Sequence, residues 1–283
     1  MSHLSSSDIA RSFSQAARSY DAAAFFQRIA GKRLFERLDY FKLAPKSIVD
    51  LGCGTGVFTR ELSQRFPQAK VTGVDIAEGM IAWCKQQSQS EDYLCADAMK
   101  LPFEDNSLDL IFSNLAIQWL EDLPQLFAEL NRVLKPEGLL LFTTLGPDTL
   151  TELKQSFAAV DAYQHVNDFI DMHNVGDAML HAKMLDPVVD AEPVVISYDK
   201  AIELMRDLKD IGAHNVNSRR SLGLMSPRKL KAVEKAYKQF ALGNGQLPAT
   251  YELVYGQAFG SEQKATLDYH EYIVELAEGK RDV

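Results

Sequence analysis

One short segment combines a carboxylate with three alternating glycines and is the part of this sequence best suited to bind a small molecule. Asp50 ends an apolar run, and Gly52, Gly54 and Gly56 follow before a helical pattern begins. Glycines permit a tight turn and let a ligand approach the backbone, and the following helix starts with unpaired N–H groups. The arrangement predicts a ligand-binding loop between a strand and a helix.

The spacing of these glycines argues against a dinucleotide. The dinucleotide fingerprint is G-x-G-x-x-G, and its third glycine would have to stand at Val57 or Thr59. The acid-x-G-x-G-x-G spacing instead resembles motif I of class I S-adenosylmethionine-dependent methyltransferases. A carboxylate at Asp50 suits a ligand with a sulfonium and an ammonium group, whereas it would repel a pyrophosphate.

The same resemblance implies further cofactor contacts at the ends of the next strands. Asp75 is expected to accept hydrogen bonds from the ribose hydroxyls. Asp97 and Ala98 are expected to bracket the adenine. The methionine and methyl end is assigned to Asn114, Leu115 and Ala116. The remaining residues that the resemblance places at the cofactor are Gln27, Cys53, Ile76, Met80 and Met99.

Such a site requires strands whose carboxyl ends meet, and the hydrophobic pattern predicts them. Short apolar runs at 47–51, 71–75, 93–97, 108–114, 139–145, 192–198 and 251–259 are typical of strands. Helical patterns at 58–66, 78–87 and 123–134 separate the first of them. The alternation predicts an α/β fold with a doubly wound, seven-strand, mostly parallel sheet. In such folds ligands bind at the carboxyl ends of the strands.

The remaining sequence predicts helices around this sheet within a single domain, residues 1–283. Residues 1–45 are expected to form an N-terminal helical lid, since apolar residues recur there at helical spacing from Phe13 to Ala24. Two helical insertions, 147–190 and 200–246, are expected over the active site. No strand pattern is recognised between 148 and 190.

Composition and charge limit the class of protein. The net charge of −9 argues against a nucleic acid partner, and no apolar run is long enough to span a membrane. Residues 1–11 lack the apolar core of a signal peptide, and three cysteines without metal-ligand spacing fit a reducing cytoplasm. Residues 200–240 stand apart, because ten basic and four acidic residues give them a charge of +6. This segment is either a solvated face or a docking surface for an acidic partner.

Several longer motifs carry a closer resemblance. Residues 12–21 with Gln27, residues 114–119, residues 186–188, and residues 208–215 with Arg219 and Arg220 resemble the malonyl-[acyl-carrier protein] O-methyltransferases of biotin synthesis. The resemblance extends over about residues 10–260. It implies that S-adenosylmethionine methylates the free carboxylate of a malonyl group on an acyl carrier protein. The basic segment 200–240 would then be the carrier-protein docking surface.

The chemistry of that reaction matches the residues present. A malonyl carboxylate is ionised at pH 7, so the reaction needs alignment and exclusion of water and no general base. Arg219 or Arg220 is the candidate partner for the carboxylate, and the alternative is that both face water or the carrier protein. Tyr20 is the candidate lid residue over the methyl group, and the alternative is ordinary helix packing.

Other functions remain open at the level of sequence. No H-E-x-x-H motif or carboxylate triad occurs, so no metal is expected. A related methyltransferase for a quinone or a free carboxylic acid would also explain the glycine loop. An assembly factor or hydroxylase of the same fold would bind the cofactor without methylating a malonyl thioester.

Overall fold

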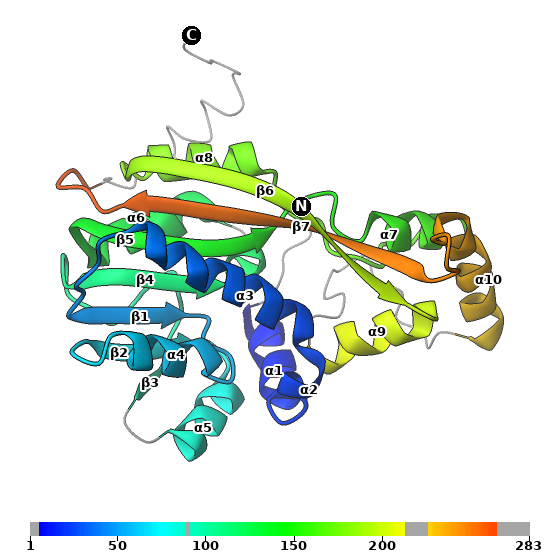
Figure 1. The fold of residues 1–283 in the computed structure, drawn as a ribbon, viewed down its shortest axis with the longest axis horizontal. Helices are drawn as coiled ribbons and strands as arrows, with labels where there is room; N and C mark the ends of the chain where they lie inside the picture. The colour runs from blue at the N-terminus through cyan, green and yellow to red at the C-terminus, as the bar shows by residue number, and fades with distance from the viewer. Residues whose placement is uncertain (1–5, 89–90, 121, 213–225, 265–283) are drawn as a thin grey trace, which may run out of the picture.

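A seven-stranded sheet forms the centre of the molecule (Figure 1). The structure, a computed structural model, describes residues 6–88, 91–120, 122–212 and 226–264. The strand order is β3-β2-β1-β4-β5-β7-β6, and β7 alone runs antiparallel to both of its neighbours. The strands are β1 (Ser47–Leu51), β2 (Lys70–Asp75), β3 (Asp92–Cys95), β4 (Leu108–Asn114), β5 (Leu134–Leu145), β6 (Leu185–Tyr198) and β7 (Leu247–Phe259). The predicted fold class is confirmed.

Helices cover both faces of the sheet. The helices and 3-10 turns are α1 (Ser6–Ala16), α2 (Tyr20–Ala23), α3 (Phe25–Arg37), η1 (Leu38–Tyr40), α4 (Val57–Arg65), α5 (Glu78–Gln87), η2 (Ile117–Trp119), α6 (Leu123–Val133), α7 (Thr151–Ala158), α8 (Met172–His181), α9 (Ala201–Asp210), α10 (Pro227–Tyr237) and η3 (Lys238–Phe240). Alternation along β5 explains the two layers. Leu139 and Leu141 pack in the cluster that holds α3 and α4, whereas Leu140 and Phe142 pack with α6 and α8.

Local sequence sets where helices begin. The side chain of Asp122 accepts a hydrogen bond from the Gln125 N–H at 3.0 Å, and a proline stands in the first turn of α6. Ser226 caps α10 in the same way, with the Lys229 N–H at 3.2 Å and Pro227 in the first turn. A capping oxygen satisfies an unpaired N–H, and proline gives up a donor that the first turn does not use.

One expectation about secondary structure is wrong. Residues 185–190 were expected to be helical, but β6 begins at Leu185. This strand is at the edge of the sheet and has β7 as its single neighbour, so its side chains alternate without a continuous apolar run. Pro187 and Pro193 lie within it, which an edge strand tolerates because one side of its backbone makes no ladder. The strand at 93–97 is also shorter than expected and ends at Cys95, before Asp97.

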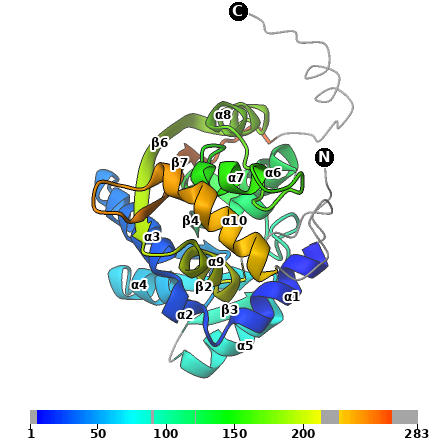
Figure 2. The same cartoon turned by 90° about the vertical axis from the view of Figure 1, so that its right-hand side faces the viewer.

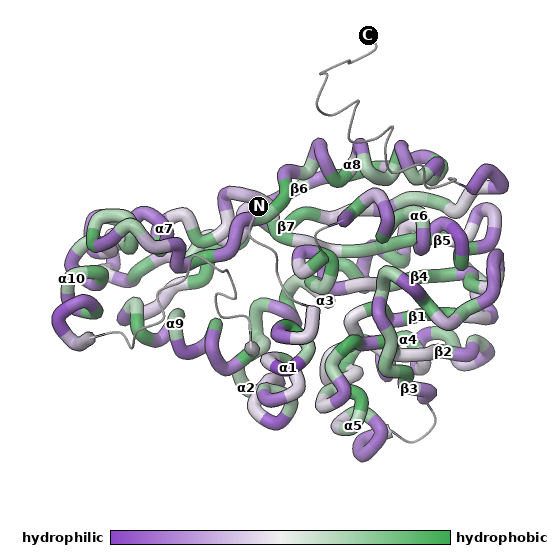
Figure 3. Tube along the Cα trace, turned by 180° about the vertical axis from the view of Figure 1, so that it is seen from behind, coloured by the Kyte–Doolittle hydropathy of each residue, from purple (hydrophilic) through white to green (hydrophobic). Residues whose placement is uncertain are grey.

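The carboxyl end of β6 and the start of β7 project beyond the rest of the sheet, together with α7, α9 and α10 (Figures 1 and 2). In Figure 3, α9 and α10 alternate between hydrophobic and hydrophilic residues. Their apolar residues, Leu204 of α9 with Val233 and Tyr237 of α10, are buried in the main core. The helix α8 lies elsewhere, against α6 and β6, so the segment 147–190 divides between two parts of the molecule. No helix in the described ranges is long and apolar enough to cross a membrane.

Candidate active site

The glycine loop turns sharply between β1 and α4. Gly52, Gly54 and Gly56 all have positive φ, at 71°, 53° and 76°, a region that other residues adopt only with strain. The N–H of Gly54 donates to Asp75 Oδ2 at 2.9 Å, which ties the loop to the end of β2. A Cβ placed on Gly54 would meet nothing nearer than the Tyr20 ring at 3.9 Å. The loop backbone therefore faces open space beneath Tyr20.

That space is a cavity of about 100 Å³ at the carboxyl ends of the strands. Its wall includes most of the predicted cofactor residues: Gly52, Gly54, Asp75, Ile76, Met80, Asp97, Ala98, Asn114, Leu115 and Ala116. The helix α1 contributes Ser6, Ile9 and Phe13, and η2 ends beside it with Trp119. We refer to it as the cofactor cavity.

Asp75 is one of two carboxylates at the wall of the cofactor cavity, and Asp97 is the other. Its Oδ1 accepts the Ala77 N–H at 2.8 Å and its Oδ2 accepts the Gly54 N–H. Burial raises the pKa of Asp75, while these backbone donors act in the opposite direction. A carboxylate offers about four acceptor positions, so a group with these backbone donors still has acceptor capacity for a ligand hydroxyl.

Asp50 is placed differently from the expectation that it would lie beside the ligand. Strand alternation turns its side chain to the same face as Ile48, under α4, where Thr59 Oγ1 donates to Asp50 Oδ2 at 2.6 Å. Asp50 is 2% exposed and does not line the cofactor cavity. Burial raises its pKa to about 7. Asp50 therefore supports the glycine loop from behind.

Three further predicted cofactor residues also lie outside the cavity wall. Cys53 packs with Ile81, Cys84 and Tyr93 on the far side of the loop. A Cβ at Gly56 would meet Tyr93, so this glycine serves the turn and its contact with the strand behind it. Met99 follows Asp97 and donates its backbone N–H to Asp97 Oδ1 at 2.9 Å.

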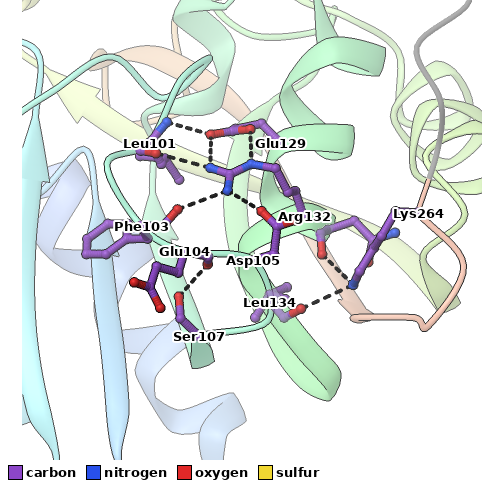
Figure 4. A network of polar contacts seen from close by, with 10 residues as sticks. Leu101, Phe103, Glu104, Asp105, Ser107, Glu129, Arg132, Leu134 and Lys264 are labelled. Carbon is purple, nitrogen blue, oxygen red and sulfur yellow. Dashed lines mark hydrogen bonds and ion pairs between the residues drawn. The ribbon is translucent and has the colours of Figure 1, made fainter.

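The loop after β3, which carries Asp97 and Ala98, is held by a network that the sequence analysis did not identify (Figure 4). Arg132 of α6 donates to the carbonyl oxygens of Leu101 and Phe103 at 3.1 and 2.9 Å. It also pairs with Glu129 and Asp105, each at 2.7 Å. The guanidinium thus uses its fork of donors to fix the loop that borders the cofactor cavity.

A second cavity of about 220 Å³ adjoins the first, and we refer to it as the acceptor chamber. Phe13, Tyr20, Leu115 and Trp119 line both cavities and form their common boundary. The chamber wall is mainly apolar and comes from α3, α7, α9 and the loop before α8. Phe26 of α3 stacks on Tyr251 of β7 with ring centroids 4.0 Å apart, which joins the N-terminal helices to the projecting strands.

The N-terminal helices are tied to both cavities. Thr55 Oγ1 of the glycine loop donates to Asp21 of α2 at 2.6 Å, and Ser12 Oγ of α1 donates to the Gly212 carbonyl at 2.9 Å. Tyr20 lies at the boundary, and burial, followed by the charges of Asp75 and Asp21, raises its pKa. Its hydroxyl therefore stays protonated at neutral pH. Tyr20 thus lines both cavities, and its role as a lid residue stays a prediction.

Gln27 belongs to the acceptor chamber and not to the cofactor cavity, in contrast to the expectation from resemblance. The backbone carbonyl of Gln27 accepts a hydrogen bond from Asn114 Nδ2 at 2.9 Å. Asn114 Oδ1 accepts one from the Thr143 hydroxyl at 2.8 Å. Asn114 therefore connects α3 to the ends of β4 and β5. This link holds α3 against the strand ends at Gln27, whose residue lines the acceptor chamber.

The predicted carboxylate partners, Arg219 and Arg220, lie outside the residues that the structure describes. Within the described ranges, the chamber wall contains no lysine or arginine, and its polar side chains include Gln27, Gln118, His165 and Asn167. His165 Nε2 bonds Asp161 at 2.9 Å, and Asp161 also pairs with Lys229 of α10. Among all the residues that the structure describes, no cluster of three or more His, Cys, Asp or Glu could hold a metal ion.

The groups at the wall of the cofactor cavity suit S-adenosylmethionine, since they combine a glycine backbone with carboxylates and an apolar boundary. The fold matches the YcgJ protein of Bacillus subtilis with a TM-score of 0.57 at 17% identity, over 81% of this chain and 98% of that one. It also matches a phosphoethanolamine N-methyltransferase of Haemonchus contortus solved with S-adenosyl-L-methionine, with a TM-score of 0.54, 17% identity and coverage of 88% and 57%. A family model described as a methyltransferase domain matches residues 49–142. The chain is a class I S-adenosylmethionine-dependent methyltransferase.

Curated relatives define the family more narrowly. The chain is 44% identical over 267 residues to a malonyl-[acyl-carrier protein] O-methyltransferase of Gallionella capsiferriformans, which covers 91% of this chain and 92% of that protein. A protein of the same name from Legionella pneumophila is 40% identical over 260 residues, with coverage of 91% and 92%. The chain belongs to the family of malonyl-[acyl-carrier protein] O-methyltransferases.

Proposed function

We propose that this chain transfers a methyl group from S-adenosylmethionine to the free carboxylate of malonyl-acyl carrier protein, and so makes a methyl ester for biotin synthesis. The observation that carries the proposal is the common boundary of Phe13, Tyr20, Leu115 and Trp119. A methyl donor in one cavity meets an acceptor in the other across these side chains. The names of the curated relatives supply the identity of that acceptor.

The chain's own residues align the reactants and exclude water. S-adenosylmethionine would supply an electrophilic methyl group on a sulfonium, and an ionised carboxylate can attack it without a base. The new carbon–oxygen bond replaces the methyl carbon–sulfur bond, whose electron pair stays on the sulfur of the leaving S-adenosylhomocysteine. Asp75 holds the ribose end, and the rings of Phe13, Tyr20 and Trp119 keep water from the boundary. Phe13 packs edge-on against Trp119 with ring centroids 5.3 Å apart, which supports both rings. No step requires a metal ion.

Arg219 and Arg220 remain the candidates for pairing with the malonyl carboxylate. A carboxylate that leaves water needs a donor partner, and a guanidinium provides two parallel hydrogen bonds. The described chamber wall is without such a cation, and the segment that carries both arginines directly follows α9, which contributes Met205 and Leu208 to the chamber. This neighbourhood in sequence supports the proposal.

We place the carrier protein on the basic segment 200–240. Acyl carrier proteins are small and acidic, so a local positive surface on a negatively charged enzyme favours productive encounter. Both α9 and α10 lie at the projecting end of the molecule (Figure 2), and α9 contributes Met205 and Leu208 to the wall of the acceptor chamber. The exposed basic residues of the described part of this segment are Lys200, Arg206, Lys209, Arg228, Lys231, Lys235 and Lys238.

Transfer of a labelled methyl group tests the proposed function. Malonyl-acyl carrier protein should be labelled, malonyl-coenzyme A more slowly, and acetyl-acyl carrier protein not at all, because it has no free carboxylate. A chelator should leave the rate unchanged. Absence of transfer to either malonyl thioester would contradict the proposal and favour a small-molecule methyltransferase or a non-methylating protein of the same fold.

A further inference from the structure

We propose that Gln118 accepts a hydrogen bond from an amide N–H of the phosphopantetheine arm, so that the chamber recognises the arm as well as the malonyl group. The inference rests on the proposed function. It concerns a side chain of η2 that lines the acceptor chamber and does not line the cofactor cavity.

The orientation of the Gln118 amide is fixed by the backbone beside it. Its Nε2 donates to the Leu115 carbonyl oxygen at 2.6 Å. Turning the amide over would set its oxygen against that carbonyl oxygen, so Oε1 is the atom left for other contacts. This oxygen is buried and has no hydrogen-bond partner among the described residues. A buried acceptor without a donor is unfavourable, and a ligand that brings a donor would remove that cost.

Two other side-chain amides of the chamber share this condition. Gln27 Oε1 and Asn167 Oδ1 are also buried without a partner, and Asn167 is only 8% exposed. The three amides come from separate elements, α3, η2 and the loop before α8, yet they line the same chamber. A mainly apolar wall with three unpaired acceptors is suited to a ligand that alternates methylene groups with N–H donors.

The chemistry of the substrate shows which part supplies the donor. The malonyl carboxylate and the thioester carbonyl only accept hydrogen bonds, so neither can satisfy a glutamine oxygen. The first N–H of the substrate lies two methylene groups beyond the thioester sulfur, in the pantetheine arm. Gln118 is adjacent to Trp119 and bonded to Leu115, both at the common boundary, so it stands close to the acyl end of the chamber. We therefore assign the amide nearest the thioester to Gln118.

A matched pair of small substrates tests this assignment. Malonyl-N-acetylcysteamine carries the N–H, and the malonyl thioester of 2-acetoxyethanethiol replaces the N–H with an ester oxygen. The wild-type kcat/KM should be about ten-fold higher for the amide than for the ester, the usual worth of one hydrogen bond to an otherwise unpaired acceptor. In Gln118→Met, which has similar length and no amide acceptor, this ratio should fall to about one. If turnover is slow, the same ratio is measured from inhibition of malonyl-carrier methylation.

Controls separate this inference from folding and from the proposed function. Gln86→Met, at an exposed glutamine of α5, should retain the wild-type ratio, and cofactor affinity of Gln118→Met should remain normal by calorimetry. Equal use of the amide and ester by the wild type would overturn the inference while methylation of malonyl-carrier protein persists. A Gln118→Met variant with the wild-type ratio would overturn it as well. Loss of carrier methylation in the wild type would instead refute the proposed function.

Discussion

The cofactor cavity and the acceptor chamber share a wall but are built in different ways. The cofactor cavity is formed largely by the backbone and by residues at the ends of strands that follow each other in the chain, from Leu51 to Leu120. The acceptor chamber gathers side chains from α3, α7, α9, the loop before α8 and β7. A ligand held by strand ends depends on the sheet, whereas a ligand held by the chamber depends on how distant helices pack. Substrate choice can thus change without disturbing cofactor binding.

The largest expected effect concerns Asp50, the buried carboxylate behind the glycine loop of the cofactor cavity. In the folded protein the pKa of Asp50 is raised to about 7, so the protonated form is favoured by folding. The contribution of Asp50 to the free energy of unfolding is fully present below about pH 4 and is lost as the pH rises through 7. Asp50→Asn should therefore stabilise the protein at pH 8 by roughly 4 kcal/mol, at about 1.36 kcal/mol per unit of pKa, and by little at pH 4.

Urea unfolding of the cofactor-free protein at both pH values measures this difference. Asp92→Asn, at an exposed carboxylate on β3 that pairs with Lys70, serves as the control for the loss of a surface charge. A destabilised Asp50→Asn at pH 8 would show that the ionised carboxylate is needed in the fold.

The next effect concerns Asp75, which does line the cofactor cavity. Asp75→Ala removes the acceptor for the Gly54 and Ala77 N–H groups and, in the proposed function, for the ribose hydroxyls. S-adenosylmethionine affinity should fall by about ten-fold or more, as expected for a lost charged hydrogen bond. Calorimetric titration of Asp75→Ala and of the control Asp92→Ala measures it. An unchanged affinity in Asp75→Ala would contradict the ribose assignment.

A third prediction concerns the boundary between the two regions. Tyr20→Ala opens the wall between the cavities and should lower kcat for the carrier substrate by about ten-fold through loss of alignment and water exclusion. Tyr20→Phe keeps the ring and should remain within about two-fold of the wild type, less than one hydrogen bond is usually worth. Single-turnover methyl transfer gives both values. A large loss in Tyr20→Phe would show instead that the hydroxyl contacts the reactants.

The smallest effect concerns the proposed carrier-protein docking surface on α10. Lys231→Glu with Lys235→Glu reverses two exposed charges one turn apart on α10. The KM for malonyl-carrier protein should rise by about three- to five-fold at low salt and by less at high salt, as expected of exposed charges. Malonyl-coenzyme A kinetics should stay unchanged. The double reversal Lys32→Glu with Lys42→Glu, at exposed lysines elsewhere, is the control. An equal effect of both reversals would exclude a specific docking surface on α10.

The two regions also differ in how well the sequence predicts them. Asp75 was found because an acid after an apolar run ends a strand, and neighbouring parallel strands end at the same edge. The glycine motif alone predicts Asp50 beside the ligand, whereas strand alternation puts Asp50 on the same face as Ile48, under α4. The start of β6 was missed because an exposed edge strand with prolines shows no apolar run.

The acceptor chamber depends on contacts that no local pattern encodes. A glutamine such as Gln118 gives no sign in the sequence of whether its oxygen will find a partner after folding. Arg132 reaches the Leu101 carbonyl from 31 positions away, and nothing near either residue indicates the contact. Trp119 stood within a recognised motif, but its place at the boundary follows from the packing of Phe13 against it.

The length of the paired strands β6 and β7 bears on the distance between methyl transfer and carrier-protein docking. The last pair between β5 and β7 is Leu145 with Leu253, whereas β6 and β7 stay paired as far as Tyr198 with Leu247. Residues 247–252 thus extend a two-stranded ribbon past the sheet by about 20 Å, at about 3.3 Å per residue. In the proposed function the length of the ribbon sets the distance between the place of methyl transfer and the place where a carrier would dock. Lengthening or shortening it by a pair of residues would change the length of tether that the enzyme serves.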